Sequence, residues 1–242
     1  MSTSTTKTVK TAVYSGTRNV YGDIETALKS LLYHTQVDKV YILAEDDELP
    51  FSAPNVEVVN VSGQTFFDKN GPNYSSPWTY MPMMRAAYSK MFTEDIVLSL
   101  DIDAIVTADI GDLWDINMSG YMLAGATEPH KQGFPQPYLN FGVLLMNLRE
   151  LRGLDDVIIR KLNTEYTFAN EQDVMNTLCR EHIRLIPSAY NACSFTAPCA
   201  EPKIMHYAGI GENFPWSRKR WQDEPLVQKY RAMSWEDVCR NT

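Results

Sequence analysis

The sequence predicts an α/β protein with a Rossmann-like, mostly parallel central sheet flanked by helices. Short apolar runs alternate with amphipathic segments over residues 11–110, the pattern of parallel strands joined by crossover helices. One such run, residues 96–106, contains two aspartates separated by one residue, Asp101 and Asp103. Ligands of α/β folds bind at the carboxyl ends of strands. The later part of the chain is less regular, so we expect a smaller, irregular region there.

The individual elements follow from apolar spacing and from turn residues. The first strand is expected at 11–15. Apolar residues then recur with the spacing of one helical face, at Ile24, Ala27, Leu28, Leu31 and Leu32. Further strands are expected at 39–44, 56–61, 96–101, 104–106, 122–126, 141–147 and 204–207. Helices are expected at 78–92, begun or interrupted near Pro82, at 154–162, at 171–180 with Asn170 as N-cap, and at 234–237 with a capping-box pattern.

The length fits one large domain or two small ones. The chain has 242 residues, of which 44% are hydrophobic and 21% charged, as in ordinary globular proteins. We expect residues 1–10 to be flexible and 11–242 to form a single domain. A net charge of −8 argues against nucleic acid as a partner. The polar start and the lack of a long apolar run predict a cytoplasmic protein, and the four cysteines match no zinc or redox spacing.

Asp101, Asp103 and His206 are the candidate metal ligands. In a strand, residues i and i+2 point to the same side, and carboxylates are the hard ligands that Mg²⁺ and Mn²⁺ prefer. His206 ends an apolar run and could complete a mixed oxygen and nitrogen site, which favours Mn²⁺ over Mg²⁺. The alternatives are an Asp-rich turn and a structural histidine.

Four other segments carry polar residues at the ends of predicted elements. Residues 15–21 join the first strand to the first helix, where α/β folds bind nucleotides. Arg85 is a lone cation on an apolar segment, and Asn140 and Gly142 lie where a strand begins. Residues 170–173 open a helix with acidic side chains. Each segment also has a structural explanation: an ordinary turn, an ion-paired arginine, a polar strand edge, or an acidic helix start.

In this order the segments resemble the family 8 glycosyltransferases, a group that includes glycogenin and bacterial lipooligosaccharide galactosyltransferases. The resemblance extends from residue 11 to 216. It implies a GT-A fold, with a nucleotide-binding half at 11–110 and an acceptor-binding half at 111–242. It also implies transfer of a hexose, with glucose or galactose as first candidates, from a UDP-sugar with retention of configuration, and a need for Mn²⁺, with Mg²⁺ as the alternative.

The resemblance also implies roles for individual residues. The metal ligands would be Asp101, Asp103 and His206, and the catalytic group would comprise Gln172, Glu171 and Arg85. The donor would contact Ser15, Thr17, Tyr21, Arg85, Ile102, Asn140, Gly142 and Gly209. Two positions depart from the family pattern: Glu171 replaces an aspartate, and Glu212 replaces a lysine that grips the diphosphate. Arg218, Lys219 or Arg220 could substitute for that lysine.

The sequence allows alternatives for the mechanism, the class of protein, the acceptor and the partners. Gln172 is a poor nucleophile, so we favour attack by the acceptor from the face that the diphosphate leaves over a covalent intermediate. A phosphatase with an Asp-x-Asp nucleophile and a non-catalytic nucleotide-sugar or glycan-binding protein are the alternatives. The acceptor could be a glycan, a glycolipid or a protein. A homodimer is open, and residues 216–221 suggest at most peripheral membrane contact.

Overall fold

A seven-stranded sheet forms the centre of the computed structural model, which describes residues 9–75, 79–208 and 220–240. The strand order is β3-β2-β1-β4-β7-β6-β8. The strands are β1 (Thr11–Ser15), β2 (Lys39–Ala44), β3 (Val56–Asn60), β4 (Ile96–Leu100), β6 (Leu123–Thr127), β7 (Leu139–Asn147) and β8 (Ile183–Leu185). Two further strands, β5 (Ala104–Val106) and β9 (Ile204–His206), form a separate antiparallel pair.

The sheet is mostly parallel, as predicted, with one antiparallel strand inside it. Strands β3, β2, β1 and β4 pair in parallel, and so do β6 and β8. Strand β7 runs antiparallel to both β4 and β6. The prediction did not include this reversal, because a buried strand has the same apolar pattern in either direction.

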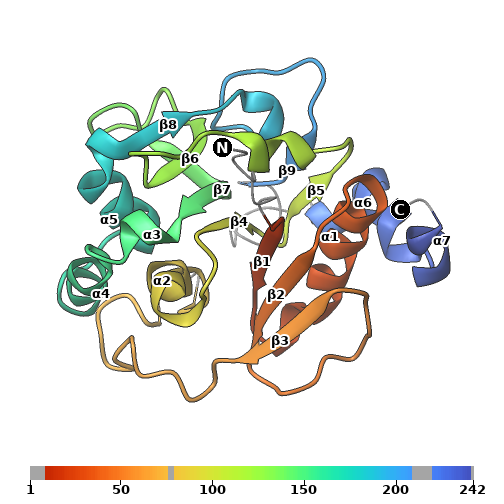
Figure 1. Cartoon of the computed structure of the whole chain (residues 1–242), viewed down its shortest axis with the longest axis horizontal. Coiled ribbons are helices and arrows are strands. Elements are labelled where there is room, and N and C mark those ends of the chain that lie inside the picture. The colour runs from red at the N-terminus through yellow and green to blue at the C-terminus, as the bar shows by residue number, and fades with distance from the viewer. Residues whose placement is uncertain (1–8, 76–78, 209–219, 241–242) are drawn as a thin grey trace, which may run out of the picture.

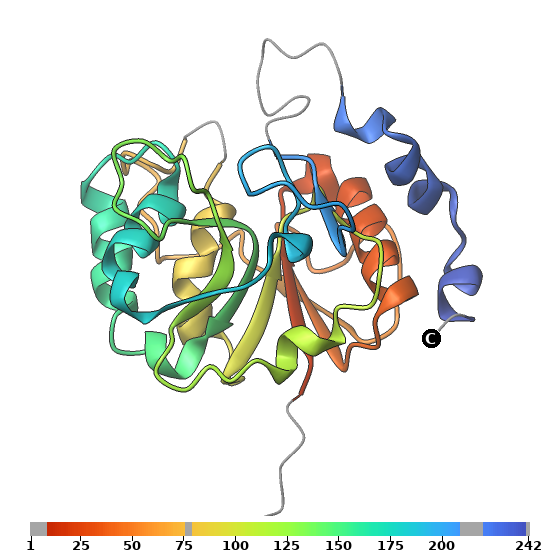
Figure 2. The ribbon, with the colours of Figure 1, turned by 90° about the horizontal axis from the view of Figure 1, so that it is seen from above.

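Helices cover both faces of the sheet (Figures 1 and 2). One side carries α1 (Tyr21–His34), with α6 (Pro225–Ala232) and α7 (Trp235–Cys239) packed against it. The other side carries α2 (Tyr88–Met91), α3 (Leu148–Leu151), α4 (Asp155–Thr164) and α5 (Asn170–Leu178). Alternate residues of β1 enter the two layers: Ala12 and Tyr14 belong to the core with α1, and Val13 to the opposite core. Strands buried on both sides explain the continuous apolar runs of the sequence.

One prediction about local structure holds in part and another is wrong. The helical segment expected at 78–92, begun or interrupted near Pro82, starts at Pro82, but its first part is a 3₁₀ helix, η2 (Pro82–Ala87), followed by the short α2; position 78 lies outside the described residues. Met83 to Ala87 are all buried. Asn170 is the first residue of α5 and not its N-cap. Asp173, inside the first turn, accepts the Ala169 N–H at 2.9 Å instead.

The remaining expectations for elements hold to within a few residues, and some elements were missed. Strand β8, helix α3 and helix α6 were not predicted. The capping residue of α7 is confirmed, because Ser234 Oγ accepts the Asp237 N–H at 3.1 Å. The four cysteines are free thiols. Within the described ranges, no helix has both the length and the apolar character needed to cross a membrane.

Candidate active site

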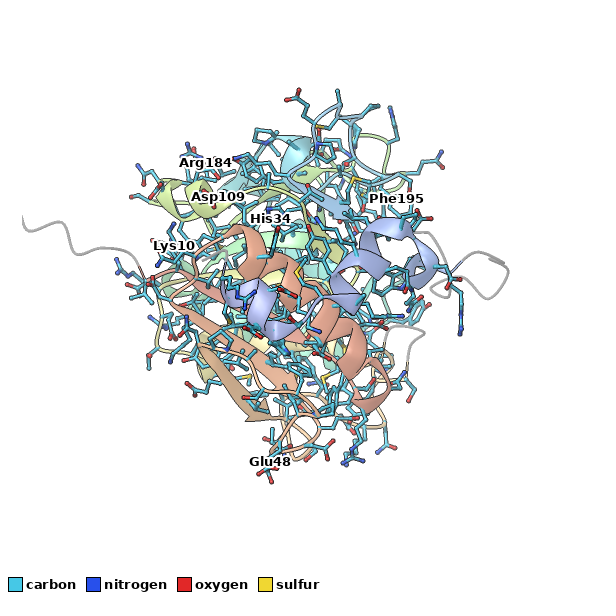
Figure 3. All side chains as sticks on the ribbon, turned by 90° about the vertical axis from the view of Figure 1, so that its right-hand side faces the viewer. Lys10, His34, Glu48, Asp109, Arg184 and Phe195 are labelled. Carbon is cyan, nitrogen blue, oxygen red and sulfur yellow. The ribbon has the colours of Figure 1, made fainter. Side chains whose placement is uncertain are left out.

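A cleft of about 770 Å³ opens at the carboxyl ends of β1 and β4. The chain leaves β1 for β2 on one side, while β4 lies on the other side, so the cleft occupies a switch point of the sheet, where α/β folds bind ligands. Its volume is in the range of sites for small molecules and cofactors. Residues after β1 and after β4 both line it. In Figure 3, Lys10, just before β1, and Phe195, on the cleft wall, lie on opposite sides of the molecule.

Asp101, Asp103 and His206 come together in this cleft. One potential ligand atom from each lies within 4.8 Å of the other two. His206 Nε2 lies 3.3 Å from Asp103 Oδ1 and 3.7 Å from Asp101 Oδ2. Two carboxylates and an imidazole whose ligand atoms lie this close together form a donor set that suits Mn²⁺. The residues present therefore fit a divalent cation.

The antiparallel pairing of β5 with β9 places His206 beside the two aspartates. Ala104, which follows Asp103, is in register with His206, and the Tyr207 N–H donates to the Asp103 carbonyl at 3.0 Å. Positions 103 and 206 are far apart in sequence. This short ladder is therefore the element that assembles the cluster.

The charges around His206 favour a positive charge at the cluster. Burial acts to lower the pKa of His206, but the carboxylates of Asp103 and Asp101 outweigh it and raise the pKa well above its usual value. The other ring nitrogen, Nδ1, lies 2.8 Å from Asn191 Oδ1. The sequence analysis did not identify Asn191, because a single asparagine in an irregular segment carries no pattern.

Gly142 has a steric reason to be glycine. A Cβ atom at this position would lie 2.0 Å from His206 Cε1, a distance that atoms in contact cannot adopt. The carbonyl of Gly142 also accepts the Asp101 N–H at 2.8 Å. Gly142 thus lets the imidazole lie directly against β7 and supports the backbone of a second ligand.

Arg85 lies between the metal-ligand cluster and Glu171 and donates hydrogen bonds to both. Its guanidinium donates to Ser99 Oγ at 2.9 Å, to Glu171 Oε1 at 2.7 Å and to Asp101 Oδ1. Burial acts to lower the pKa of Arg85, but the carboxylates of Asp101 and Glu171 have the stronger effect, so the pKa lies above its usual value. Arg85 therefore stays a fixed cation in the wall of the cleft.

Glu171 is almost fully buried, with 2% of its surface exposed. Burial raises its pKa to about 6, against the opposing effect of Arg85. Glu171 and Arg85 both line the cleft. The acid that departs from the family pattern is thus held in place by the arginine.

Gln172 and Asn140 meet at a carboxylate that the sequence analysis missed. Glu128 Oε1 accepts the Asn140 side-chain N–H at 2.7 Å and lies 3.4 Å from Gln172 Nε2. The side-chain oxygen of Gln172, Oε1, accepts the Phe141 N–H at 2.9 Å. Glu128, Asn140 and Gln172 all line the cleft. Glu128 follows a strand end, but an acid at that position is common and gave no signal.

Comparison with known proteins identifies the family. Residues 26–220 match the sequence model of "Glycosyl transferase family 8", which is more than half of the chain. The chain belongs to glycosyltransferase family 8. The glycosyltransferase class expected from the sequence is thereby confirmed at the level of the family.

The family 8 chain is similar to curated glycosyltransferases of Streptococcus pneumoniae. It is 28% identical to GlyE over 261 residues, covering 95% of this chain and 61% of GlyE. It is 25% identical to GlyF over 252 residues, covering 89% of this chain and 60% of GlyF. The chain therefore spans about three fifths of the length of these relatives.

Solved structures confirm the GT-A fold. The crystal structure of GlyE matches with a TM-score of 0.71 and 24% identity, over 97% of this chain and 63% of GlyE. The galactosyltransferase LgtC, solved with donor and acceptor sugar analogs, matches with a TM-score of 0.66 and 19% identity, over 96% of this chain and 100% of LgtC.

The turn after β1 in this family 8 chain contributes two of the three residues expected from it. Ser15 and Thr17 line the cleft, as does Ile102. Tyr21, in contrast, is 6% exposed, and its hydroxyl accepts the Glu45 N–H at 2.9 Å and contacts Asp46. Within this turn, which the structure describes completely, the cleft wall includes Asn19 and Val20 but not Tyr21. The short 3₁₀ helix η1 (Arg18–Val20) decides which side chains face inward.

Several predicted residues of the family 8 chain lie outside the described residues. These are Gly209, Glu212, Arg218 and Lys219. Of the three basic substitutes for the missing lysine, Arg220 is described, and it lines the cleft. Trp221, expected in a membrane-contacting segment, is 3% exposed and stacks on Tyr207 with ring centroids 6.2 Å apart. The ring of Trp221 therefore belongs to the core, and peripheral membrane contact of this segment stays a prediction.

Proposed function

We propose that this chain transfers a hexose from a UDP-sugar to an acceptor, with retention of configuration and with Mn²⁺ as cofactor. UDP-glucose and UDP-galactose are the first donors to test, and the cytoplasm is the proposed location. The observation that carries the proposal is the convergence of Asp101, Asp103 and His206 in a cleft at the switch point of the sheet. Mg²⁺ is the alternative cation.

The reaction needs negative charge to be stabilised on the leaving diphosphate. A divalent cation on Asp101, Asp103 and His206 would act as a Lewis acid toward that diphosphate. Arg85 would add electrostatic stabilisation from the wall of the cleft, since its ion pairs hold it in one position. Glu171 would contact the donor sugar, and its longer side chain still reaches Arg85 at 2.7 Å.

Retention would follow from attack on the face that the diphosphate leaves. The C1–oxygen bond to the diphosphate breaks, the acceptor oxygen bonds to C1, and the acceptor proton passes to a diphosphate oxygen. Gln172 is neutral, so its carbonyl would support positive charge at C1 without forming a bond. Glu128 is the carboxylate beside it, and its Oε1 already receives Asn140 and Gln172 N–H groups. A glycosyl adduct on Glu128, detected by mass spectrometry, would contradict this mechanism.

On the acceptor side we propose a sugar as the group that receives the hexose. Phe168 and Phe195 line the cleft while keeping 68% and 41% of their surfaces exposed. Exposed aromatic rings offer flat apolar surface for a partner, and Glu128 and Gln172 supply polar groups nearby for hydroxyls. Replacing Phe195 by Ala should raise the KM for the acceptor and leave the rate of UDP-sugar hydrolysis without acceptor unchanged.

Calorimetric titration with UDP, with and without Mn²⁺, tests the metal and the nucleotide together. The Asp101→Asn/Asp103→Asn double variant should lose Mn²⁺-dependent binding. A matched control, Asp95→Asn/Asp109→Asn, makes the same charge change at residues away from the cleft wall and should bind like the wild type. Retained Mn²⁺-dependent affinity in the first double variant would refute the metal assignment.

A panel of UDP-sugars would then identify the donor. Hydrolysis without acceptor, followed by NMR of the released hexose, should show the donor's anomer first. The opposite anomer would contradict retention. Binding of UDP without any turnover of UDP-sugars would instead support a non-catalytic nucleotide-sugar-binding protein.

A further inference from the structure

A chain of buried side-chain hydrogen bonds runs from His206 away from the carboxylates. His206 Nδ1 lies 2.8 Å from Asn191 Oδ1. Asn191 Nδ2 donates to Asn140 Oδ1 at 2.9 Å, and Asn140 Nδ2 donates to Glu128 Oε1 at 2.7 Å. All four residues are at most 6% exposed. Four segments distant in sequence thus meet in one polar line through the core.

Backbone groups determine the orientation of both amides in this chain. Asn191 Nδ2 also contacts the carbonyl oxygen of Asn140 at 3.2 Å, and a carbonyl oxygen can only accept. Asn140 Oδ1 receives the Gly142 N–H at 3.0 Å, and a backbone N–H can only donate. Exchanging O and N in the Asn191 amide would place two acceptors against each other. The same exchange in Asn140 would place two donors against each other. Donation runs in one direction, from His206 to Glu128.

We propose that Asn191 is a positioning residue that keeps the proton of His206 on Nδ1 and presents Nε2 to the metal. Asn191 Oδ1 is held as an acceptor, so the ring nitrogen facing it must be the donor. Nε2 is then the nitrogen that faces Asp103 Oδ1 at 3.3 Å. Glu128 ends the chain as a buried carboxylate and anchors its direction. This inference rests on the proposed metal-dependent function.

The expected loss of Mn²⁺ affinity on replacing Asn191 is estimated from other metal sites. Metal-binding histidines generally donate their second ring N–H to a fixed acceptor, and removal of that acceptor weakens metal binding by about 10- to 100-fold. Asn191→Leu removes the acceptor and keeps the branching at Cγ. Asn191→Asp keeps an acceptor for Nδ1–H, so it should bind Mn²⁺ more tightly than Asn191→Leu.

Asn73 provides a matched control. It is fully buried and makes three hydrogen bonds, donating to the carbonyls of Leu162 and Glu165 and accepting the Thr167 N–H. None of these groups lines the cleft. Asn73→Leu should lower the melting temperature but leave the Mn²⁺ dissociation constant unchanged.

The experiment measures Mn²⁺ affinity by electron paramagnetic resonance for the wild type and these three variants. We expect a loss of about 10- to 100-fold for Asn191→Leu, a smaller loss for Asn191→Asp and none for Asn73→Leu. Equal affinity in Asn191→Leu and wild type would overturn the inference alone, and so would equal losses in Asn191→Leu and Asn73→Leu. Absence of Mn²⁺ binding by the wild type would overturn the proposed function and this inference with it.

A second measurement does not use the Asn191 variants. Nitrogen-15 NMR of the histidines in the wild-type protein, loaded with diamagnetic Mg²⁺, reports which ring nitrogen of His206 carries the proton. The chain has four histidines, and His206→Gln assigns the signal. We expect a proton on Nδ1 and none on Nε2. A proton on Nε2 alone would overturn the inference.

Discussion

At the scale of single residues, Gly142 shows how a small side chain at one position determines a site elsewhere in the sequence. A Cβ atom there would displace the His206 ring, which is buried and held by Asn191. We expect Gly142→Ala to weaken Mn²⁺ binding by on the order of 10- to 100-fold, as for other losses of ligand support. Calorimetry with Mn²⁺ checks this, with circular dichroism to confirm folding.

The control for that substitution is Gly22→Ala in α1. A Cβ atom at Gly22 meets nothing within 4 Å, and alanine is the better helix former. Gly22→Ala should keep full Mn²⁺ affinity. If Gly142→Ala binds Mn²⁺ as well as Gly22→Ala does, the steric account of this position is wrong.

The buried ion pair of Arg85 with Glu171 should contribute to stability. Arg85→Met leaves Glu171 buried without its partner, and breaking a buried ion pair in this way costs about 3–5 kcal/mol of unfolding free energy. Adding Glu171→Gln removes the unpaired charge and should recover much of that loss. Urea unfolding in the presence of EDTA measures all three proteins.

The exposed pair of Arg149 and Asp95 is the comparison. Arg149→Met should change the unfolding free energy little, because exposed ion pairs contribute little. Equal losses in Arg85→Met and Arg149→Met, or no recovery in the double variant, would contradict the structural role of the buried pair.

The candidate residues differ in how visible they are in sequence. Asp101, Asp103, Arg85, Asn140, Gly142 and His206 stand at element ends or as lone polar residues in apolar runs, and the structure brings them together in or beside the cleft. Glu128 and Asn191 carry no such pattern, and only their contacts with predicted site residues such as Asn140 reveal them. The resemblance assigned Tyr21 to the donor site, but the preceding residue, Val20, lines the cleft, because Glu45 and Asp46 hold the Tyr21 hydroxyl elsewhere.

At the scale of elements, the pairing of β5 with β9 assembles the metal cluster. Met205 is in register with Ile105 in the middle of this pair. Met205→Pro removes a ladder donor, since proline has no N–H. We expect the variant to lose Mn²⁺ affinity while the seven-stranded sheet remains, because Asp103 and His206 would no longer be held together. Mn²⁺ titration and far-ultraviolet circular dichroism measure the two effects.

A proline in another edge strand is the matched control. Val59 lies in β3, at the end of the main sheet, and the register with β2 directs its N–H toward β2. Val59→Pro should therefore remove a ladder donor from its strand without changing Mn²⁺ affinity. Unchanged affinity in Met205→Pro would show that the ladder does not hold the ligands together.

Strands were easier to predict than helices for a physical reason. Buried strands such as β1 and β2 are short apolar runs bounded by polar residues, and their bounds match the prediction. The segment before β4 is buried on all sides, so its apolar pattern does not distinguish an α-helix from the 3₁₀ helix η2. Strand β8 has three residues and is only partly buried, too little for a pattern.

At the scale of the whole molecule, ligands from both parts of the chain meet in one cleft, so metal binding should stabilise the fold. Binding at a concentration 100 times the dissociation constant adds about 2.7 kcal/mol. We expect Mn²⁺ to raise the melting temperature by several degrees and EDTA to reverse this shift. Asp101→Asn/Asp103→Asn should show no shift, and an equal shift in that variant would place the stabilising ion elsewhere.

The sequence by itself determined the fold class, the main strands and the residue types of the site, because burial on two faces and carboxylates at a strand end leave local patterns. It also supported the family. The tertiary structure alone decided the reversed β7, the β5–β9 pair, the burial of Tyr21 and Trp221, and the hydrogen-bond chain from His206 to Glu128. These features depend on contacts between residues far apart in the chain, and such contacts leave no periodic trace in a single sequence.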